Sequence, residues 1–240
     1  MTKEFIESVL LALAKEQKVF WSEADFQFAF AWKLKEMFED SNPQSTINVR
    51  LERRVDALKK RDDEKKSGDA YIDIWVEIDK IVYPIELKYK TIKCIIKDGY
   101  EEYKLKQHSA SDIGCYLYLK DVKRIEELSK SLGDKFGKGF AIMLTNDHLY
   151  WDRPNTSTDT TIFRDFRIYE ERKIVAGATL DWGTPSDNRP AWQKRLGPLT
   201  LTHNYTINWK DYPKLNKEGN ANGEDFPFKY TIIEINSDQS

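Results

Sequence analysis

The chain has 240 residues, of which 40% are hydrophobic and 13% aromatic, and its formal net charge at pH 7 is −2. This composition favours a well-packed globular protein over a disordered one, and the length suits one elaborated domain or a core with a subdomain. Because the net charge gives no overall attraction for nucleic acid, a nucleic-acid-binding face must come from local clusters of basic residues.

The two cysteines, Cys94 and Cys115, lack the spacing of metal ligands and indicate either a reducing compartment or no particular role. We expect a cytoplasmic protein. Near the N-terminus, residues 9–14 (VLLALA) are too short to span a bilayer, and they follow Glu4 and Glu7. This pattern is typical of an amphipathic helix and not of a signal peptide. We therefore expect no contact with a membrane.

A second helix is predicted from Ser22, which together with Asp25 resembles a capping box. Apolar residues then recur at helical spacing up to the breaker Ser41-Asn42-Pro43; they are Phe26, Ala29, Phe30, Leu34 and Met37. Residues 46–55, which follow this breaker, indicate a strand.

The segment 71–90 (YIDIWVEIDKIVYPIELKYK) predicts two paired strands, because apolar and polar residues alternate in both halves. A tight reversal at residues 79–80 would place Asp73 directly opposite Glu86. Asp-Lys is not a favoured two-residue turn, however, and a loop with an odd number of residues would shift this register. Pro84 cannot donate to a ladder, so it predicts a bend, a bulge or an edge just before Glu86.

Two opposed carboxylates need a proton or a cation between them, because directly opposed residues have β-carbons roughly 5 Å apart and like charges there are destabilising. Mg²⁺ fits, since it prefers carboxylate oxygens and is commonly held by one or two of them plus substrate phosphate. Lys88 lies on the same face as Glu86, where its ammonium could orient or help deprotonate the attacking water. Asp73, Glu86 and Lys88 thus predict a phosphodiester hydrolysis site; alternatively, they are the solvated side of a half-exposed sheet.

An acid on one strand, followed by acid, any residue and lysine on the next, is found at Asp73 and Glu86-Leu87-Lys88. This arrangement resembles the PD-(D/E)XK, or restriction-endonuclease-like, nucleases. The resemblance implies that Asp73 and Glu86 bind Mg²⁺, for which Mn²⁺ can substitute, with help from the backbone carbonyl of Leu87. The chain departs from the family pattern at Ile72, where the family name has a proline.

The segments after the hairpin extend this resemblance. Gln107 to Leu128 predicts a helix, and the apolar run at residues 139–146 predicts a buried strand. The order helix, three strands, helix, strand resembles the common core of this superfamily over residues 20–150. The resemblance therefore implies an α/β fold in which residues 1–150 form a restriction-endonuclease-like core together with the N-terminal helix.

In many relatives the first helix of the core brings a further acid to the metal, and the resemblance implies this catalytic role for Glu23. Glu23 could equally serve only the helix dipole, and Glu52 on the first strand competes for the same role. In the second helix Gln107, Asp112 and Tyr116 could approach the site or the substrate, although Asp112 and Tyr116 are also spaced as a local structural pair.

Two clusters of basic residues are candidates for binding nucleic acid. Lys90, Lys93 and Lys97 follow Lys88 at the end of the hairpin, so this cluster is well placed, and we take Lys90 and Lys93, with Gln107, as candidate substrate-binding residues. The other cluster is interrupted by acids and reads better as a solvated loop; its members are Lys59, Lys60, Arg61, Lys65 and Lys66.

Residues 151–240 predict a β-rich extension packed on the core, because short aromatic-rich strands alternate there with Pro, Gly and Asn. The strands are expected at residues 163–169, 173–182, 205–209 and 228–235. Four aromatic residues could either stack unpaired bases or form the core of this small layer; they are Trp182, Trp192, Tyr205 and Trp209.

These observations lead to the hypothesis of a Mg²⁺-dependent nuclease that acts on nucleic acid, on DNA rather than RNA, and that could work as a homodimer. The first alternative is a non-catalytic module of the same shape that binds nucleic acid or a protein. The second alternative is the hydrolysis of another phosphate ester, because the metal chemistry is shared.

Overall fold

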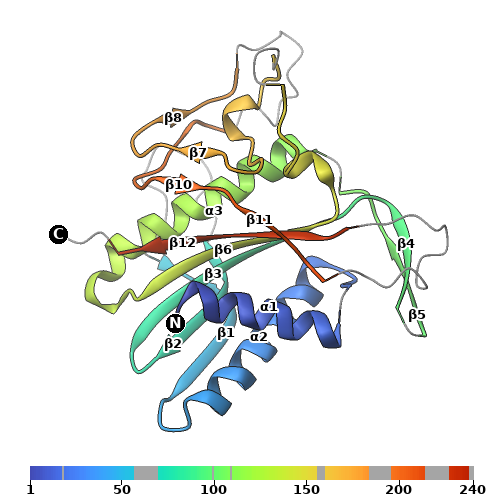
Figure 1. The fold of residues 1–240 in the computed structure, drawn as a ribbon. Coiled ribbons are helices and arrows are strands. Elements are labelled where there is room, and N and C mark those ends of the chain that lie inside the picture. Colours follow the sequence, from blue (N-terminus) through green and yellow to red (C-terminus); the bar gives the residue numbers. More distant parts are fainter. Residues whose placement is uncertain are drawn as a thin grey trace.

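The computed structural model describes residues 1–17, 19–56, 70–98, 100–108, 110–155, 160–183, 196–213 and 227–237. Over these residues the chain forms a mixed six-stranded β-sheet with three α-helices, as Figure 1 shows, so the predicted α/β class is confirmed. Within these ranges, no helix combines the length and the apolar character needed to cross a membrane.

The strand order of the sheet is β1-β2-β3-β6-β12-β11, and all neighbours are antiparallel except β3 and β6, which are parallel. The predicted strands at residues 46–55 and 139–146 are confirmed as β1 and β6. The strands are β1 (Ile47–Arg54), β2 (Tyr71–Ile78), β3 (Ile81–Lys90), β6 (Lys138–Thr145), β11 (Trp209–Asp211) and β12 (Lys229–Asn236).

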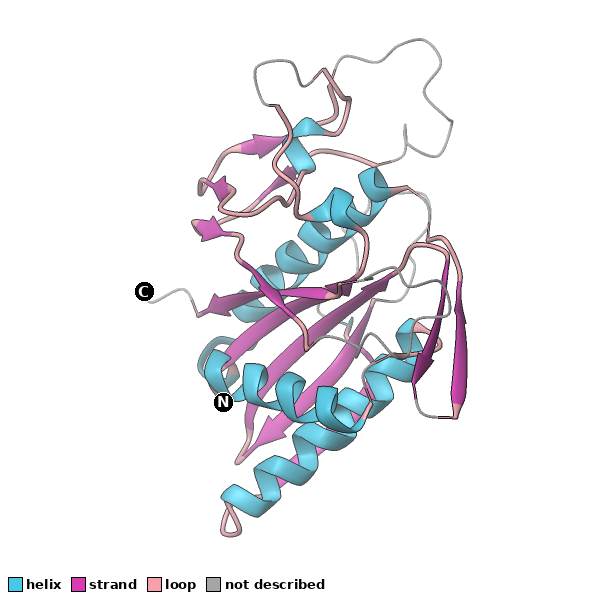
Figure 2. Ribbon diagram, turned by 45° about the vertical axis from the view of Figure 1, so that its right-hand side comes forward, coloured by secondary structure: helices cyan, strands magenta, loops and turns pink. Residues whose placement is uncertain are grey.

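The three helices cover both faces of the sheet (Figures 1 and 2). α1 (Lys3–Glu16) and α2 (Glu23–Ser41) pack on one face, and α3 (Ser111–Leu132) packs on the other, where it connects β3 to β6. α2 begins where the sequence predicts, because the Ser22 hydroxyl accepts a hydrogen bond from the backbone N–H of Asp25 at 3.1 Å.

α3 begins at Ser111, later than predicted, so the expected place of Gln107 within this helix is wrong. The reason is a set of bonds to the residue that follows β3. The backbone N–H of His108 donates to the carbonyl of Thr91 at 2.8 Å, and the Thr91 hydroxyl donates to the carbonyl of Lys106 at 2.8 Å. These contacts hold the chain against the end of β3 and delay the start of the helix.

The turn between β2 and β3 is the tight reversal that the predicted register requires. Asp79 and Lys80 have φ values of 49° and 73°, and such a pair of left-handed residues is typical of a type I′ turn. The Asp79 carboxylate accepts a hydrogen bond from the N–H of Thr46 at 3.2 Å, which helps to hold this turn despite its weak local preference. The ladder ends with Ile74 opposite Ile85, so the predicted register is confirmed.

Pro84 lies within β3 opposite Trp75 of β2. On the other side of β3, the bridge between Val82 and Phe136 is followed by the pair of Ile85 with Phe140 in β6. Between these two pairs, residues 137–139 lie opposite residues 83–84. Three residues against two make the bulge that the proline predicts.

A hairpin of β4 and β5 projects from one side of the molecule, and two short two-stranded sheets, β7–β10 and β8–β9, lie beyond α3 (Figures 1 and 2). The remaining elements are β4 (Cys94–Asp98), β5 (Glu101–Leu105), β7 (Lys173–Ile174), β8 (Thr179–Leu180), β9 (Leu199–Thr200), β10 (Tyr205–Thr206) and the 3₁₀ helices η2 (Gly133–Lys135), η3 (His148–Tyr150) and η4 (Arg164–Phe166).

The C-terminal strands differ from the prediction. Residues 163–169 contain the 3₁₀ helix η4 instead of a strand, and the segment 173–182 is split into β7 and β8 by a turn in which Gly177 has a φ of 77°. The last predicted strand does form as β12, but it pairs with β6 in the central sheet. This sheet therefore contains strands from both sides of residue 150.

The C-terminal aromatic residues are mainly core residues. Trp182, Tyr205 and Trp209 are 6%, 8% and 7% exposed and pack in one hydrophobic core with α3. Their burial excludes an exposed base-stacking surface at these three positions. Trp192 lies outside the described residues.

Candidate functional site

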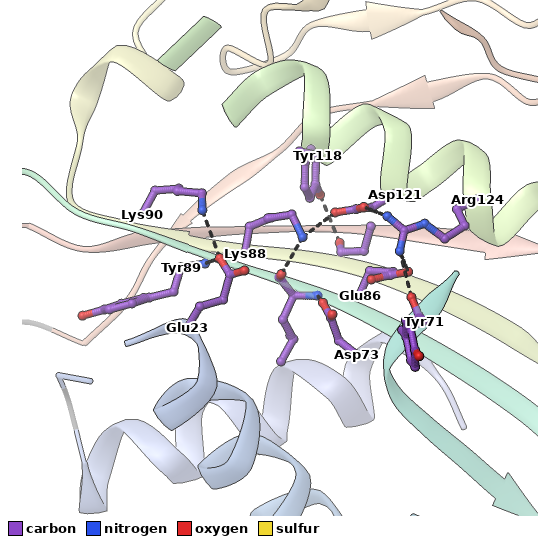
Figure 3. A network of polar contacts seen from close by, with 12 residues as sticks. Glu23, Tyr71, Asp73, Glu86, Lys88, Tyr89, Lys90, Tyr118, Asp121 and Arg124 are labelled. Carbon is purple, nitrogen blue, oxygen red and sulfur yellow. Dashed lines mark hydrogen bonds and ion pairs between the residues drawn. The ribbon is translucent and has the colours of Figure 1, made fainter. Parts of the chain in front are cut away.

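The end of the β2–β3 ladder brings the predicted acids and lysine together (Figure 3). The Asp73 carboxylate accepts a hydrogen bond from the backbone N–H of Leu87 at 2.7 Å. From the α2 side, the amide of Gln27 donates to the backbone carbonyl of Asp73 and, at 3.0 Å, to the carboxylate of Glu52. Asp73 is thus fixed beside the part of β3 that contains Glu86 and Lys88.

Lys88 has a well-defined position because two acceptors hold its amine. The Nζ atom donates to the carbonyl of Leu87 at 3.0 Å and forms an ion pair with Asp121 at 2.7 Å. Burial lowers the pKa of Lys88, but the carboxylates of Asp121, Asp73 and Glu23 outweigh it and raise this pKa above its ordinary value. The amine therefore keeps its proton, so Lys88 can orient a water or a phosphate but is unsuited to accept a proton.

The Glu86 carboxylate is only 1% exposed and has one cationic partner in the described residues, the guanidinium of Arg124 at 3.0 Å. Burial raises the pKa of Glu86 well above its ordinary value, and repulsion from Asp121 and Asp73 raises it further. Neither carboxylate oxygen makes a hydrogen bond within the described part of the chain. Such a group needs a cation or a proton.

Asp121 and Arg124 of α3 are site residues that the sequence analysis missed. The Asp121 carboxylate is buried and bridges two cations, Lys88 at 2.7 Å and Arg124 at 2.6 Å. A signal existed in the sequence, because Asp121 interrupts the apolar stripe that Tyr118 and Ile125 form at helical spacing. A charged residue within such a stripe indicates a partner across the interface.

Glu23, the predicted further acid, lies on the Lys88 side of the site (Figure 3). Its carboxylate accepts hydrogen bonds from the backbone N–H of Tyr89 at 2.9 Å and from the amine of Lys90 at 3.1 Å. The competing acid, Glu52, lies next to Asp73 through its bond to Gln27. Both candidates therefore lie beside the end of the β2–β3 hairpin, Glu23 near Tyr89 and Glu52 near Asp73.

The other predicted residues lie in different places. Gln107 accepts a hydrogen bond from the backbone N–H of Lys93 at 3.2 Å, and both residues are exposed at the base of the β4–β5 hairpin. Gln107 and Asp112 line a surface depression of about 500 Å³ near the start of α3. Tyr116 is buried against Phe166 in the core, so it does not face the site. The cluster at residues 59–66 lies outside the described residues.

The arrangement fits a divalent cation in its charge and its donor atoms. Three carboxylates (Asp73, Glu86 and Asp121) face two cations (Lys88 and Arg124), and the buried oxygens of Glu86 lack hydrogen bonds within the described part. No cluster of three or more His, Cys, Asp or Glu ligands occurs in that part. Two carboxylates are nevertheless enough for Mg²⁺ when a substrate phosphate completes the ligand set.

Comparison of the chain with models of protein families, with curated proteins and with solved structures finds no match.

Proposed function

We propose that this chain is a Mg²⁺-dependent nuclease that hydrolyses phosphodiester bonds in DNA, on a restriction-endonuclease-like core. The observation that carries the proposal is the end of the β2–β3 ladder. There the Asp73 carboxylate accepts a hydrogen bond from the backbone N–H of Leu87, which lies between Glu86 and Lys88 on β3. The order of helices and strands through α2, β1, β2, β3, α3 and β6 agrees with that core. Cytoplasmic location and a homodimer stay predictions from the sequence.

The carboxylates of Asp73 and Glu86 and the carbonyl of Leu87 would hold the cation. When bound, Mg²⁺ neutralises phosphate charge and lowers the pKa of the attacking water. The protonated amine of Lys88, held by Asp121 and by the carbonyl of Leu87, would orient the phosphate or the water and stabilise negative charge that develops during the reaction. Glu23 and Lys90 would extend the polar surface along β3.

A cleavage assay with matched variants tests the proposal. Supercoiled plasmid is incubated with the parent protein in Mg²⁺, in Mn²⁺ or in EDTA, beside the variants Lys88→Met and Lys35→Met. Lys35 is a suitable control because it pairs with Glu39 on the outer face of α2. We expect the parent and Lys35→Met to nick the plasmid in Mg²⁺ and in Mn²⁺ but not in EDTA. Absence of plasmid cleavage by the parent in both metals would overturn the proposal.

One observation favours the alternative of a non-catalytic binding module: the guanidinium of Arg124 already contacts the carboxylate of the buried Glu86 at 3.0 Å. If this pair is permanent, the protein would bind nucleic acid without cutting it. A gel-shift measurement on the same samples separates the two functions, since binding in EDTA without any cleavage in Mg²⁺ indicates the module.

A further inference from the structure

Arg124 links three parts of the site. Its guanidinium contacts the carboxylate of Glu86 at 3.0 Å, the carboxylate of Asp121 at 2.6 Å and the backbone carbonyl of Tyr71 at 2.8 Å (Figure 3). It therefore ties α3 to both strands of the hairpin. Its side chain is 27% exposed, whereas the Glu86 side chain is 1% exposed. The guanidinium thus lies between the buried acid and the solvent.

The contact with Glu86 differs from the other two contacts. Asp121 is also paired with Lys88, and the carbonyl of Tyr71 is a neutral acceptor, but Glu86 forms no second ion pair within the described residues. An ionised carboxylate at this depth needs a cation. In the protein without a metal, Arg124 supplies that positive charge.

The proposed function gives Glu86 a second cationic partner. A divalent cation and a guanidinium that contact the same carboxylate repel each other, and this repulsion is strong away from bulk water. We propose that Arg124 and the divalent cation compete for Glu86, and that Arg124, once displaced, binds the substrate phosphate. This inference rests on the proposed function, because it takes Glu86 as a metal ligand.

The remaining contacts of Arg124 suit the second part of this exchange. Asp121 and Tyr71 can hold the guanidinium at the solvent side of the site after Glu86 is released. A planar guanidinium presents several N–H donors in a geometry that matches a phosphate. Arg124 would then contact the substrate directly and would be a further catalytic residue.

The decisive measurement compares Arg124→Met with Lys123→Met, which removes the same charge one residue away on α3, where Lys123 pairs with Glu127. Calorimetric titration with Mg²⁺, without nucleic acid and in the same buffer for both variants, should show cation affinity raised ~10-fold in Arg124→Met only. Binding of a labelled DNA duplex in Ca²⁺ should weaken ~10-fold relative to Lys123→Met.

Opposite changes in the two affinities are the signature, because a merely structural Arg124 would lower both. Cation affinity that is unchanged or weaker in Arg124→Met would overturn the inference and leave the proposed function standing. Duplex binding equal to that of Lys123→Met would overturn the role at the phosphate. If neither the parent nor any variant binds a cation, both the inference and the proposed function fail.

A second variant keeps the test valid if Arg124→Met does not fold. Arg124→Gln is neutral but retains an amide donor for the carbonyl of Tyr71 or for Asp121. Its thermal melt confirms folding before the titrations are compared, and the same opposite changes are expected.

Discussion

The carboxylate of Asp73 accepts a hydrogen bond from the backbone N–H of Leu87 at 2.7 Å, just past the last pair of the β2–β3 ladder. The side chain thereby takes the place of a backbone acceptor where the two strands separate. Only the Oδ2 atom of Asp73 accepts a hydrogen bond, and its Oδ1 atom has no hydrogen-bond partner within the described residues. Asp73 is thus anchored by one oxygen and can offer the other to a ligand.

Asp73→Asn should separate metal binding from folding. The amide oxygen of asparagine can still accept from Leu87, and repulsion from Glu86 disappears, so the free energy of unfolding in EDTA should stay within about 1 kcal/mol of the parent or rise. Affinity for Mg²⁺ should fall at least ~10-fold, because a ligand charge is lost. Urea unfolding and calorimetry measure the two quantities. The exposed Asp134→Asn is the control, and undiminished affinity in Asp73→Asn would contradict the site.

Lys88→Met should abolish most cleavage while metal affinity is kept, because the amine is not a metal ligand. Single-turnover cleavage at saturating Mg²⁺ should fall ~10²–10⁴-fold, the usual size of acid–base or charge assistance by one side chain. Lys35→Met serves again as the control. A parental rate in Lys88→Met would mean that Lys88 belongs to the solvated face of the sheet.

Asp121→Asn should destabilise the protein because it keeps the shape of the side chain but removes the charge that two cations share. Lys88 loses its buried anionic partner and Arg124 keeps only Glu86, so the free energy of unfolding should fall by about 3 kcal/mol. Cleavage should decrease through poorer positioning of Lys88, with kcat affected more than KM. Urea unfolding that matches the parent would show that this carboxylate contributes little.

Stability without metal should depend on pH through Glu86. Burial and the nearby Asp121 and Asp73 raise its pKa, so the folded protein keeps a proton that the unfolded chain has lost. Folding then takes up a proton, and the free energy of unfolding falls as pH rises from the ordinary glutamate range toward the raised pKa, by at most about 1.4 kcal/mol per pH unit.

Urea unfolding of the parent and Glu86→Gln in EDTA, across this pH range, checks the pH dependence. The free energy of unfolding should decline less with rising pH in Glu86→Gln, because glutamine has no proton to lose at this position. Part of the decline should remain, because the pKa of Asp121 is also raised. Equal slopes in the two proteins would be inconsistent with a raised pKa at Glu86.

Glu126→Gln should weaken the attachment of the C-terminal segment to α3 without affecting the site. The buried Glu126 carboxylate accepts from the backbone N–H groups of Thr202 and His203 and from the hydroxyl of Tyr205. The loss of charge should lower the free energy of unfolding by about 2 kcal/mol. Mg²⁺ affinity, measured by calorimetry, should not change; a large decrease would show that this segment supports the site.

The sequence alone determined the features that depend on neighbouring residues. Alternation of apolar and polar residues on both sides of Asp79-Lys80 predicted the register that places Asp73 level with Glu86, because each step along a strand reverses the side-chain direction. Ser22 predicted the start of α2 for an equally local reason, since its hydroxyl bonds to a backbone N–H three residues later.

Features that depend on distant contacts were harder to predict. Gln107 continues a helical pattern in the sequence, but bonds from Thr91 hold that part of the chain outside α3. The last strand was predicted in a separate layer, yet β12 pairs with β6 in the central sheet. Period alone shows that a strand exists and which face is buried, but it does not identify the strand beside it.

The charges around the site were decided only by the tertiary structure. The sequence placed Glu86 and Lys88 on one face of a strand, but it did not show that Arg124 and Asp121 would pair with them. These partners meet because α3 crosses the sheet after β3 and packs against β3 and β6. The position of a helix on a sheet is set by the packing of many side chains along both, so the helical spacing indicates that Asp121 has a partner but does not identify it.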